Sequence, residues 1–257
     1  MLPHFFIESP LRRILTIFAR ESTPKSDFYR SAIVLKHTAK IDYPLLLVVF
    51  FSFLAGFASS ITGQEFHLDQ EVLNKAELKY GKDARRLLVD WQILIVENGG
   101  RTDLEKLERV NEFFNQMEFV DDLKHWGKND YWATPIEFLG TRGGDCEDFS
   151  IAKYFTLKAM GVDEEKLNLT YVKALHYNVH HMVLTYFRTP EAEPLVLDNL
   201  VGKIKPASQR MDLIPIYSFN GTGLWLAKQR ERGNLAGSSS RLQRWQDLIQ
   251  RMAEDNF

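Results

Sequence analysis

The chain has 257 residues, of which 45% are hydrophobic and 26% are charged, the composition of an ordinary folded protein rather than a disordered or low-complexity one. Its 32 Lys and Arg residues against 34 Asp and Glu residues give a net charge of −2, which argues against nucleic-acid binding because no basic field is present. The single cysteine excludes an intramolecular disulfide, a CxxC redox motif and a zinc ribbon.

The beginning of the chain differs from the rest in charge and hydropathy. Residues 1–60 carry a net charge of +3, which leaves −5 for the remainder, and residues 43–64 contain no charged side chain. Within that run, PLLLVVFFSFLAGFASSI at 44–61 is long enough to span a bilayer as a helix. It predicts either a membrane anchor or the apolar core of a signal peptide, and a buried core helix is the alternative. Both export interpretations place the following residues outside the cytoplasm.

Helices are expected first after this segment. Residues 69–98 show helical spacing of apolar side chains, and Gly81 should divide them into two helices. Thr102 and Glu105 have the spacing of a capping box, which predicts the start of a third helix.

Residues 121–144 show no clear period and are expected to be irregular, whereas residues 145–160 again have a helical pattern that Gly161 ends. Runs rich in β-branched and aromatic residues then replace the helical pattern, as is typical of strands. The predicted strands are residues 168–175, 180–188, 194–200, 214–219 and 224–228. A Gly/Ser-rich linker over residues 233–240 should lead to a final helix over 241–254.

These elements divide the chain into three expected parts. They are an N-terminal extension over residues 1–62, a folded domain over 65–230, and a linker with a C-terminal helix over 231–257. Helices followed by an antiparallel sheet indicate the α+β class.

Cys146 follows two glycines in the sequence GGDCEDF. Asp145 is a good N-cap, so the cysteine should lie in the first turn of a helix, where the dipole and free N–H groups favour a thiolate and can hold an oxyanion. The position therefore predicts a nucleophile. The alternative is a small buried apolar residue, with Asp145, Glu147 and Asp148 merely complementing the helix dipole.

His181 and Asp198 are the expected partners of this cysteine. A thiol nucleophile needs a base, and the base needs an acceptor that orients it. His180 and His181 lie on a predicted strand and should point to opposite faces, so that only one of them can serve. Asp198 ends the next apolar run, where an acid is costly unless it is paired, although it could simply be a turn residue.

Four sequence blocks in this order resemble the bacterial transglutaminase-like cysteine proteinases over residues 69–228. The blocks are WATPIEFL from Trp132, GDCEDF from Gly144, HMVL from His181 and LDNL from Leu197. The resemblance implies a papain/transglutaminase-like fold. It also implies that Cys146 attacks a peptide carbonyl, that His181 transfers protons, and that Asp198 orients His181.

The resemblance further implies a biological role. Members of this family are calcium-dependent periplasmic endopeptidases that cleave a large cell-surface adhesin and so control biofilm attachment. An inner-membrane cyclic-di-GMP receptor sequesters the protease. Three carboxylates around Cys146 should raise the pKa of its thiol, and Ca²⁺ held by Asp145, Glu147 and Asp148 would offset them, since oxygen ligands suit calcium rather than zinc.

Two rival functions stay open at this point. The same three residues could serve a transglutaminase or amidase, in which an amine can replace water as the acyl acceptor. The chain could also be a non-catalytic module that binds a membrane receptor. The long N-terminal extension departs from the family pattern, so the sequence leaves open whether residues 43–64 are cleaved or anchor the protein.

Overall fold

The computed structural model describes residues 66–228 and 231–254. The predicted extension over 1–62, and with it the candidate anchor or signal peptide, lies outside the described residues. Among the helices of the described ranges, none combines the length and hydropathy needed to cross a membrane.

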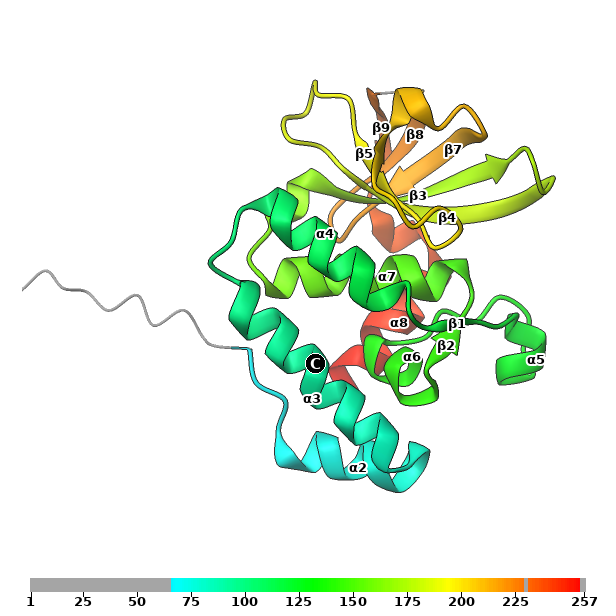
Figure 1. Cartoon of the computed structure of the whole chain (residues 1–257). Coiled ribbons are helices and arrows are strands. Elements are labelled where there is room, and N and C mark those ends of the chain that lie inside the picture. Colours follow the sequence, from blue (N-terminus) through cyan, green and yellow to red (C-terminus); the bar gives the residue numbers. More distant parts are fainter. Residues whose placement is uncertain (1–65, 229–230, 255–257) are drawn as a thin grey trace, which may run out of the picture. The chain divides into compact units, whose positions relative to one another are not determined.

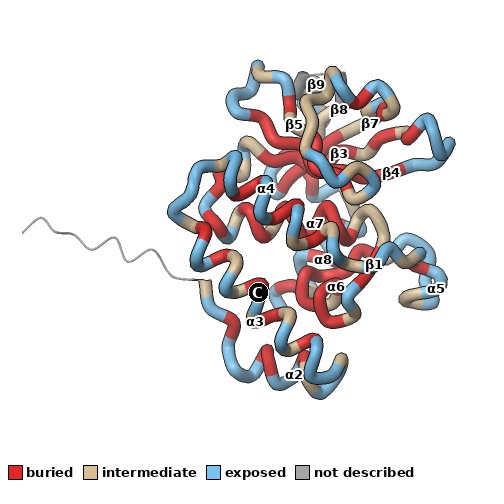
Figure 2. The backbone as a smooth tube through the Cα atoms, viewed as in Figure 1, coloured by how far each residue is buried: buried red, intermediate tan, exposed pale blue. Residues whose placement is uncertain are grey.

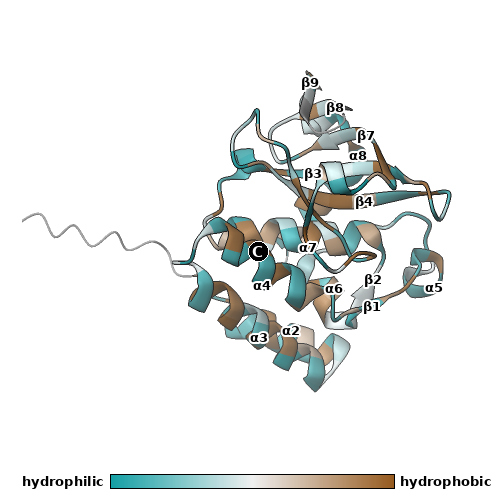
Figure 3. Ribbon diagram, turned by 45° about the horizontal axis from the view of Figure 1, so that its top comes forward, coloured by the Kyte–Doolittle hydropathy of each residue, from teal (hydrophilic) through white to brown (hydrophobic). Residues whose placement is uncertain are grey.

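The first helices form as expected. Helix α2 (Gln70–Tyr80) and helix α3 (Lys82–Asn98) are separated by Gly81, whose φ of 96° lies in the region that favours glycine. Helix α4 (Asp103–Phe114) begins with the capping box between Thr102 and Glu105. Hydrophobic and hydrophilic residues alternate along these helices (Figure 3), because each turns one face toward the core.

The expectation of irregular structure over residues 121–144 is wrong. This stretch contains helix α5 (Asp122–Trp126) and helix α6 (Pro135–Thr141), and a short parallel pair joins β1 (Glu118–Phe119) to β2 (Gly143–Gly144). Both helices are too short to show an apolar period. They are defined instead by their N-caps, an Asp121 cap for α5 and a Thr134–Glu137 capping box for α6.

Helix α7 (Cys146–Ala159) is the central element of the fold. It lies between the other helices and the sheet (Figure 1), and most of its length is buried (Figure 2). Trp91 of α3 donates a hydrogen bond to the Thr156 hydroxyl of α7 at 2.8 Å, so even the polar groups at this interface are paired.

A seven-stranded antiparallel sheet covers one side of α7, with strand order β6-β5-β4-β3-β7-β8-β9. Its strands are β3 (Leu167–Ala174), β4 (Val179–Tyr186), β5 (Leu195–Leu197), β6 (Lys205–Pro206), β7 (Leu213–Phe219), β8 (Leu224–Lys228) and β9 (Glu231–Gly237). Short 3₁₀ turns occupy Glu164–Lys166, Ala207–Gln209 and Ser239–Arg241. The α+β expectation is confirmed.

The linker expected over residues 233–240 is instead mostly strand β9, which pairs with β8. Its Gly, Ser and Asn residues have weak strand propensity, and pairing with a formed neighbour overrides that preference. Helix α8 (Gln243–Glu254) then returns to the core, where Trp245 stacks on Phe155 of α7 with ring centroids 5.6 Å apart.

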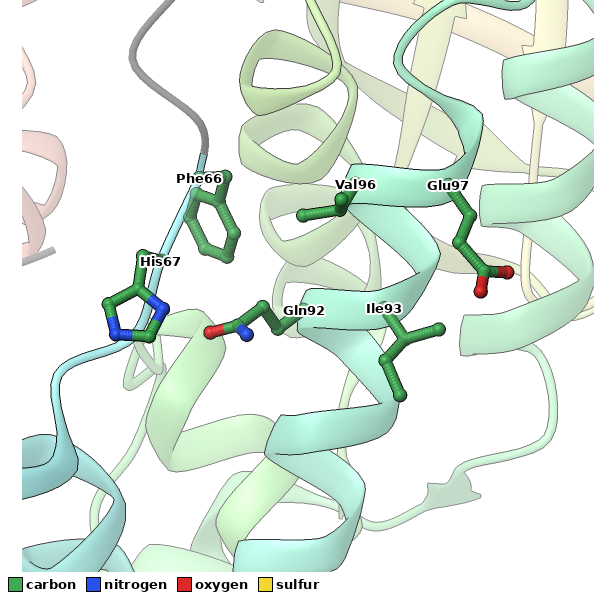
Figure 4. A pocket seen from close by; sticks show the side chains of 6 residues that line it. All are labelled: Phe66, His67, Gln92, Ile93, Val96 and Glu97. Carbon is green, nitrogen blue, oxygen red and sulfur yellow. The ribbon is translucent and has the colours of Figure 1, made fainter.

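A pocket of about 310 Å³ lies where the described chain begins. Phe66 and His67 line it together with side chains of α3, namely Gln92, Ile93, Val96 and Glu97 (Figure 4). None of these residues belongs to the site predicted from the sequence.

Candidate active site

Cys146 is the first residue of α7, and Asp145 is its N-cap, as the sequence predicts. The Asp145 side chain accepts a hydrogen bond from the Glu147 N–H, and the Asp148 side chain accepts one from the Asp145 N–H, so the two acids form a capping box. Gly144 allows the chain to approach this turn, because a Cβ at that position would overlap the Asp148 carboxylate. The local sequence therefore places the thiol at a helix N-terminus.

The thiol lies among negative groups. Its Sγ donates to Glu147 Oε2 at 2.7 Å. Burial, followed by the charges of Glu147 and Asp145, raises the pKa of the Cys146 thiol well above its ordinary value, while the Met182 N–H acts against that rise. A thiolate here needs a positive charge nearby to offset the carboxylates.

The backbone of Met182 joins α7 to strand β4. Its N–H lowers the pKa of the Cys146 thiol, and its carbonyl accepts a hydrogen bond from Ser150 Oγ at 3.0 Å. Cys146 and Ser150 are one turn apart and lie on the same side of the helix. Strand β5 pairs with β4 only from Leu184 onward, so the start of α7 lies against a part of β4 that β5 does not cover. The sulfur thus lies against the residue that follows His181.

His181 and Asp198 are brought together directly. Both are buried, and His181 Nε2 lies 2.8 Å from Asp198 Oδ1. Burial alone would raise the pKa of Asp198, but its bonds to His181, the Leu200 N–H and Arg210 lower it to about 2. Since Asp198 is therefore an anion and only accepts, Nε2 carries the proton, which leaves Nδ1 of the ring for another partner. His180 points the other way and is exposed.

Arg210 is a member of this network that the sequence does not reveal. Its buried guanidinium donates from Nη2 to Asp198 Oδ2 at 2.7 Å, and it also binds the Asp212 carboxylate through Nε and Nη2. Arg210 and Asp212 are two residues apart, which resembles an ordinary surface pair. Only the packing of the loop before β7 against Asp198 shows their place in the site.

Carboxylates cluster beside the start of α7. Oxygen atoms of Asp122, Asp145 and Asp148 lie within 4.8 Å of one another, and a second group joins Asp145, Cys146 and Glu147 at the same limit. Of the three predicted ligands, Asp148 belongs to the first group, Glu147 to the second and Asp145 to both. Asp122 lies on the short helix α5, which the sequence pattern does not reveal, and nothing in the sequence therefore marks Asp122 as a candidate ligand.

The electrostatics of this cluster fit a cation. Burial first, and then repulsion by neighbouring acids, raises the pKa of Asp122 to about 6, that of Asp145 to about 10 and that of Asp148 well above the ordinary value. Oδ1 of Asp122 is buried and has no hydrogen-bond partner among the described residues. A hard divalent cation would satisfy this oxygen and remove the repulsion, since carboxylate oxygens are its preferred ligands.

Comparisons with known proteins agree with this geometry. The family model of the bacterial transglutaminase-like cysteine proteinase BTLCP matches residues 96–230. No curated protein gives a significant match. EGTA-treated LapG of Legionella pneumophila has 45% identity and a TM-score of 0.63, over 71% of this chain and 96% of that one. Calcium-bound LapG of the same organism has 45% identity and a TM-score of 0.62, over 72% and 99% of the two chains.

Proposed function

Because the chain belongs to the bacterial transglutaminase-like cysteine proteinases and is a cysteine protease, we propose that Cys146, His181 and Asp198 are its catalytic triad. The observation that carries this proposal is the buried hydrogen bond between His181 and Asp198, together with a cysteine at a helix N-terminus that packs against the strand of His181. The Met182 backbone links the two halves of the arrangement, since its carbonyl binds Ser150 of α7, its N–H lowers the pKa of the Cys146 thiol, and it adjoins His181.

The proposed reaction is acyl transfer to water. The Cys146 thiol gives its proton to His181 Nδ1, and the thiolate attacks the peptide carbonyl carbon. The Cys146 N–H, at the start of α7 and outside the capping box, would hold the oxyanion, and the imidazolium then protonates the leaving amine. Water, deprotonated by His181, releases the acid product from the thioester. Asp198, whose pKa is about 2, is an anion at neutral pH; it keeps the ring oriented and stabilises its positive charge.

We also propose that the protease depends on calcium. Asp122, Asp145 and Asp148 would hold the ion, with Glu147 beside them. This donor set fits because its atoms are all oxygen and its carboxylates repel one another, and because Asp122 and Asp148 are buried. When bound, the ion supplies positive charge that keeps these carboxylates ionised and favours the neighbouring thiolate. The similarity to a calcium-bound LapG structure supports the proposal.

The biological role is proposed from the family. The protease would be exported to the periplasm, by a signal peptide or an anchor within residues 43–64, and would cleave a large surface adhesin. An inner-membrane cyclic-di-GMP receptor would bind it and so control biofilm attachment. The apolar run 44–61 supports export.

The test is cleavage of the N-terminal part of a large surface adhesin from the same genome. Wild-type protein should cleave it in calcium, whereas excess EGTA or Cys146→Ala should abolish cleavage while circular dichroism shows an unchanged fold. A labelled primary amine added to the reaction distinguishes a transglutaminase, which would incorporate it. Unchanged cleavage by Cys146→Ala would refute the triad, and full activity in EGTA would refute the calcium requirement.

A further inference from the structure

A row of side chains crosses the sheet outward from the sulfur. Met182 pairs with Tyr171, Tyr171 pairs with Tyr217, and Tyr217 pairs with Leu226, from β4 through β3 and β7 to β8. Residues directly opposite each other in an antiparallel ladder point to the same face of the sheet. The row therefore begins at Met182, whose carbonyl binds Ser150 one helical turn after Cys146, and it continues from β4 to β8 on one face.

The middle of this row is aromatic. The rings of Tyr171 and Tyr217 stack with centroids 5.1 Å apart, and His180 stacks on Tyr171 at 5.3 Å. Each of these pairs is nearly parallel, with interplanar angles of 21° and 11°. The stacking presents a continuous surface of ring atoms that starts beside Met182.

The row is open, whereas its neighbour on the same face is covered. Two residues beyond Tyr217 on β7, Phe219 is fully buried, because Trp132 stacks on it at 5.6 Å and Trp245 of α8 packs against its edge. In the open row Tyr171 and Tyr217 are only partly buried, and Leu226 is 62% exposed. The elements that cover Phe219 thus leave Leu226 and part of both tyrosines accessible.

Charges of the active site reach this row. Burial, and then the neighbouring acids Glu147 and Asp130 and the Cys146 sulfur, raises the pKa of Tyr171. The pKa of Tyr217 is raised to about 12 by burial, Tyr171 and Glu147. Both hydroxyls therefore stay neutral at physiological pH. The charge of Arg244 opposes the rise for both tyrosines.

We propose that Tyr171, Tyr217 and Leu226 form the floor on which an extended segment of the polypeptide substrate binds, and that Leu226 selects an apolar side chain about four residues from the cleaved bond. The proposal rests on the protease function proposed above. Strands lie about 4.8 Å apart, so the three steps from Met182 to Leu226 span about 14 Å, the length of about four residues of extended chain. Stacked tyrosines offer ring faces to side chains and peptide planes, and the open end of the row is aliphatic.

The test is a pair of substitutions with a matched control. Leu235 on β9 is 69% exposed but pairs with Trp225, the neighbour of Leu226 along β8, and therefore lies on the opposite face. Leu226→Ser and Leu235→Ser remove similar exposed leucines, and Leu226→Glu places a negative charge at the proposed subsite. Substrates are peptides spanning the adhesin cleavage site, with Leu, Asp or Lys at the fourth residue on either side of the bond.

Wild-type protein should prefer Leu over Asp at one of the two positions, and Leu226→Ser should lower kcat/KM for the Leu peptide by about tenfold. Leu226→Glu should reverse the preference in favour of Lys, by about fivefold, as an exposed ion pair allows. Leu235→Ser should behave as wild type. Unchanged preferences in both Leu226 variants, with intact melting temperatures, would overturn the inference while the protease function stands. Absence of cleavage by wild-type protein in calcium would refute both.

Discussion

Ser150 donates a hydrogen bond from Oγ to the backbone carbonyl of Met182 at 3.0 Å. The bond ties the helix that begins with Cys146 to the strand that carries His181. Because the Met182 N–H also lowers the pKa of the Cys146 thiol, one residue of β4 relates the nucleophile to the candidate base. The spacing of sulfur and imidazole therefore depends on how α7 is seated on β4.

Ser150→Ala should test this seating. The substitution leaves the buried carbonyl of Met182 without its donor, which should lower the free energy of unfolding by about 1–2 kcal/mol. We expect kcat to fall more than KM rises, because the loss affects the alignment of Cys146 and His181 rather than substrate binding. Steady-state kinetics and urea unfolding measure both effects. Ser240→Ala, at an exposed position, is the control, and equal kinetics in the two variants would contradict the role of Ser150.

Arg210→Met should weaken the hydrogen bonding that holds the Asp198 carboxylate of the proposed triad. It removes a partner from the buried Asp198 carboxylate, so the free energy of unfolding should fall by about 3 kcal/mol. Asp198 has a pKa near 2 in the folded protein against an ordinary value of 3.8, so the stability it contributes is present above pH 4 and is lost as pH falls toward 2. Without Arg210 the folded pKa rises, and the contribution becomes smaller.

Acid unfolding of the wild type and of Arg210→Met, followed by circular dichroism, measures this change. The variant should unfold at a higher pH than the wild type. Arg86→Met is the control, since Arg86 forms an exposed ion pair with Asp83 that should contribute at most about 1 kcal/mol. Equal acid midpoints for all three proteins would show that Arg210 does not act on Asp198.

Asp122→Asn should separate calcium binding from folding. Without calcium the variant should melt at a higher temperature than the wild type, because one of three clustered carboxylates loses its charge. With calcium the order should reverse, since a ligand is lost, and the affinity measured by calorimetry should fall by about tenfold or more. Asp121→Asn, at the adjacent exposed N-cap of α5, is the control for effects on that helix. An unaltered calcium affinity would exclude Asp122 from the ligand set.

Lys153 should make the free energy of unfolding depend on pH above neutrality. Burial lowers its pKa from 10.5 to about 7, although the charge of Asp198 opposes that shift. Between pH 7 and 10.5 the unfolded state therefore binds more protons than the folded state. The free energy of unfolding of the wild type should accordingly rise with pH, relative to that of Lys153→Met, by roughly a few kcal/mol. Urea unfolding at pH 6 and pH 9 measures the difference. A constant gap between the two proteins would show that Lys153 stays charged when buried.

The bonds of Lys153 explain why this position matters for the site. Its ammonium donates to Asn111 of α4 and to Asn115, which follows α4, and Asn115 in turn donates to the Asp198 carbonyl. The helix with the nucleophile is therefore connected to the loop with the acid through a third element.

Features that depend on a few neighbouring residues could be predicted from the sequence. The break at Gly81, the capping box at Thr102 and the placement of Cys146 directly after its Asp145 cap all arise from hydrogen bonds and backbone angles within one helical turn. Strand alternation likewise separated His180 from His181, because the two-residue period of a strand is a local property.

Other features exist only because distant segments meet. Asp122 reaches the carboxylates of α7 from more than twenty residues away, Arg210 reaches Asp198 from a loop beyond the next strand, and β9 forms because β8 offers it a partner. The aromatic row beside Cys146 depends on the register of four strands. Such contacts leave no periodic pattern in the chain, because packing and pairing between elements, rather than the conformational preference of any one of them, decide where these side chains lie.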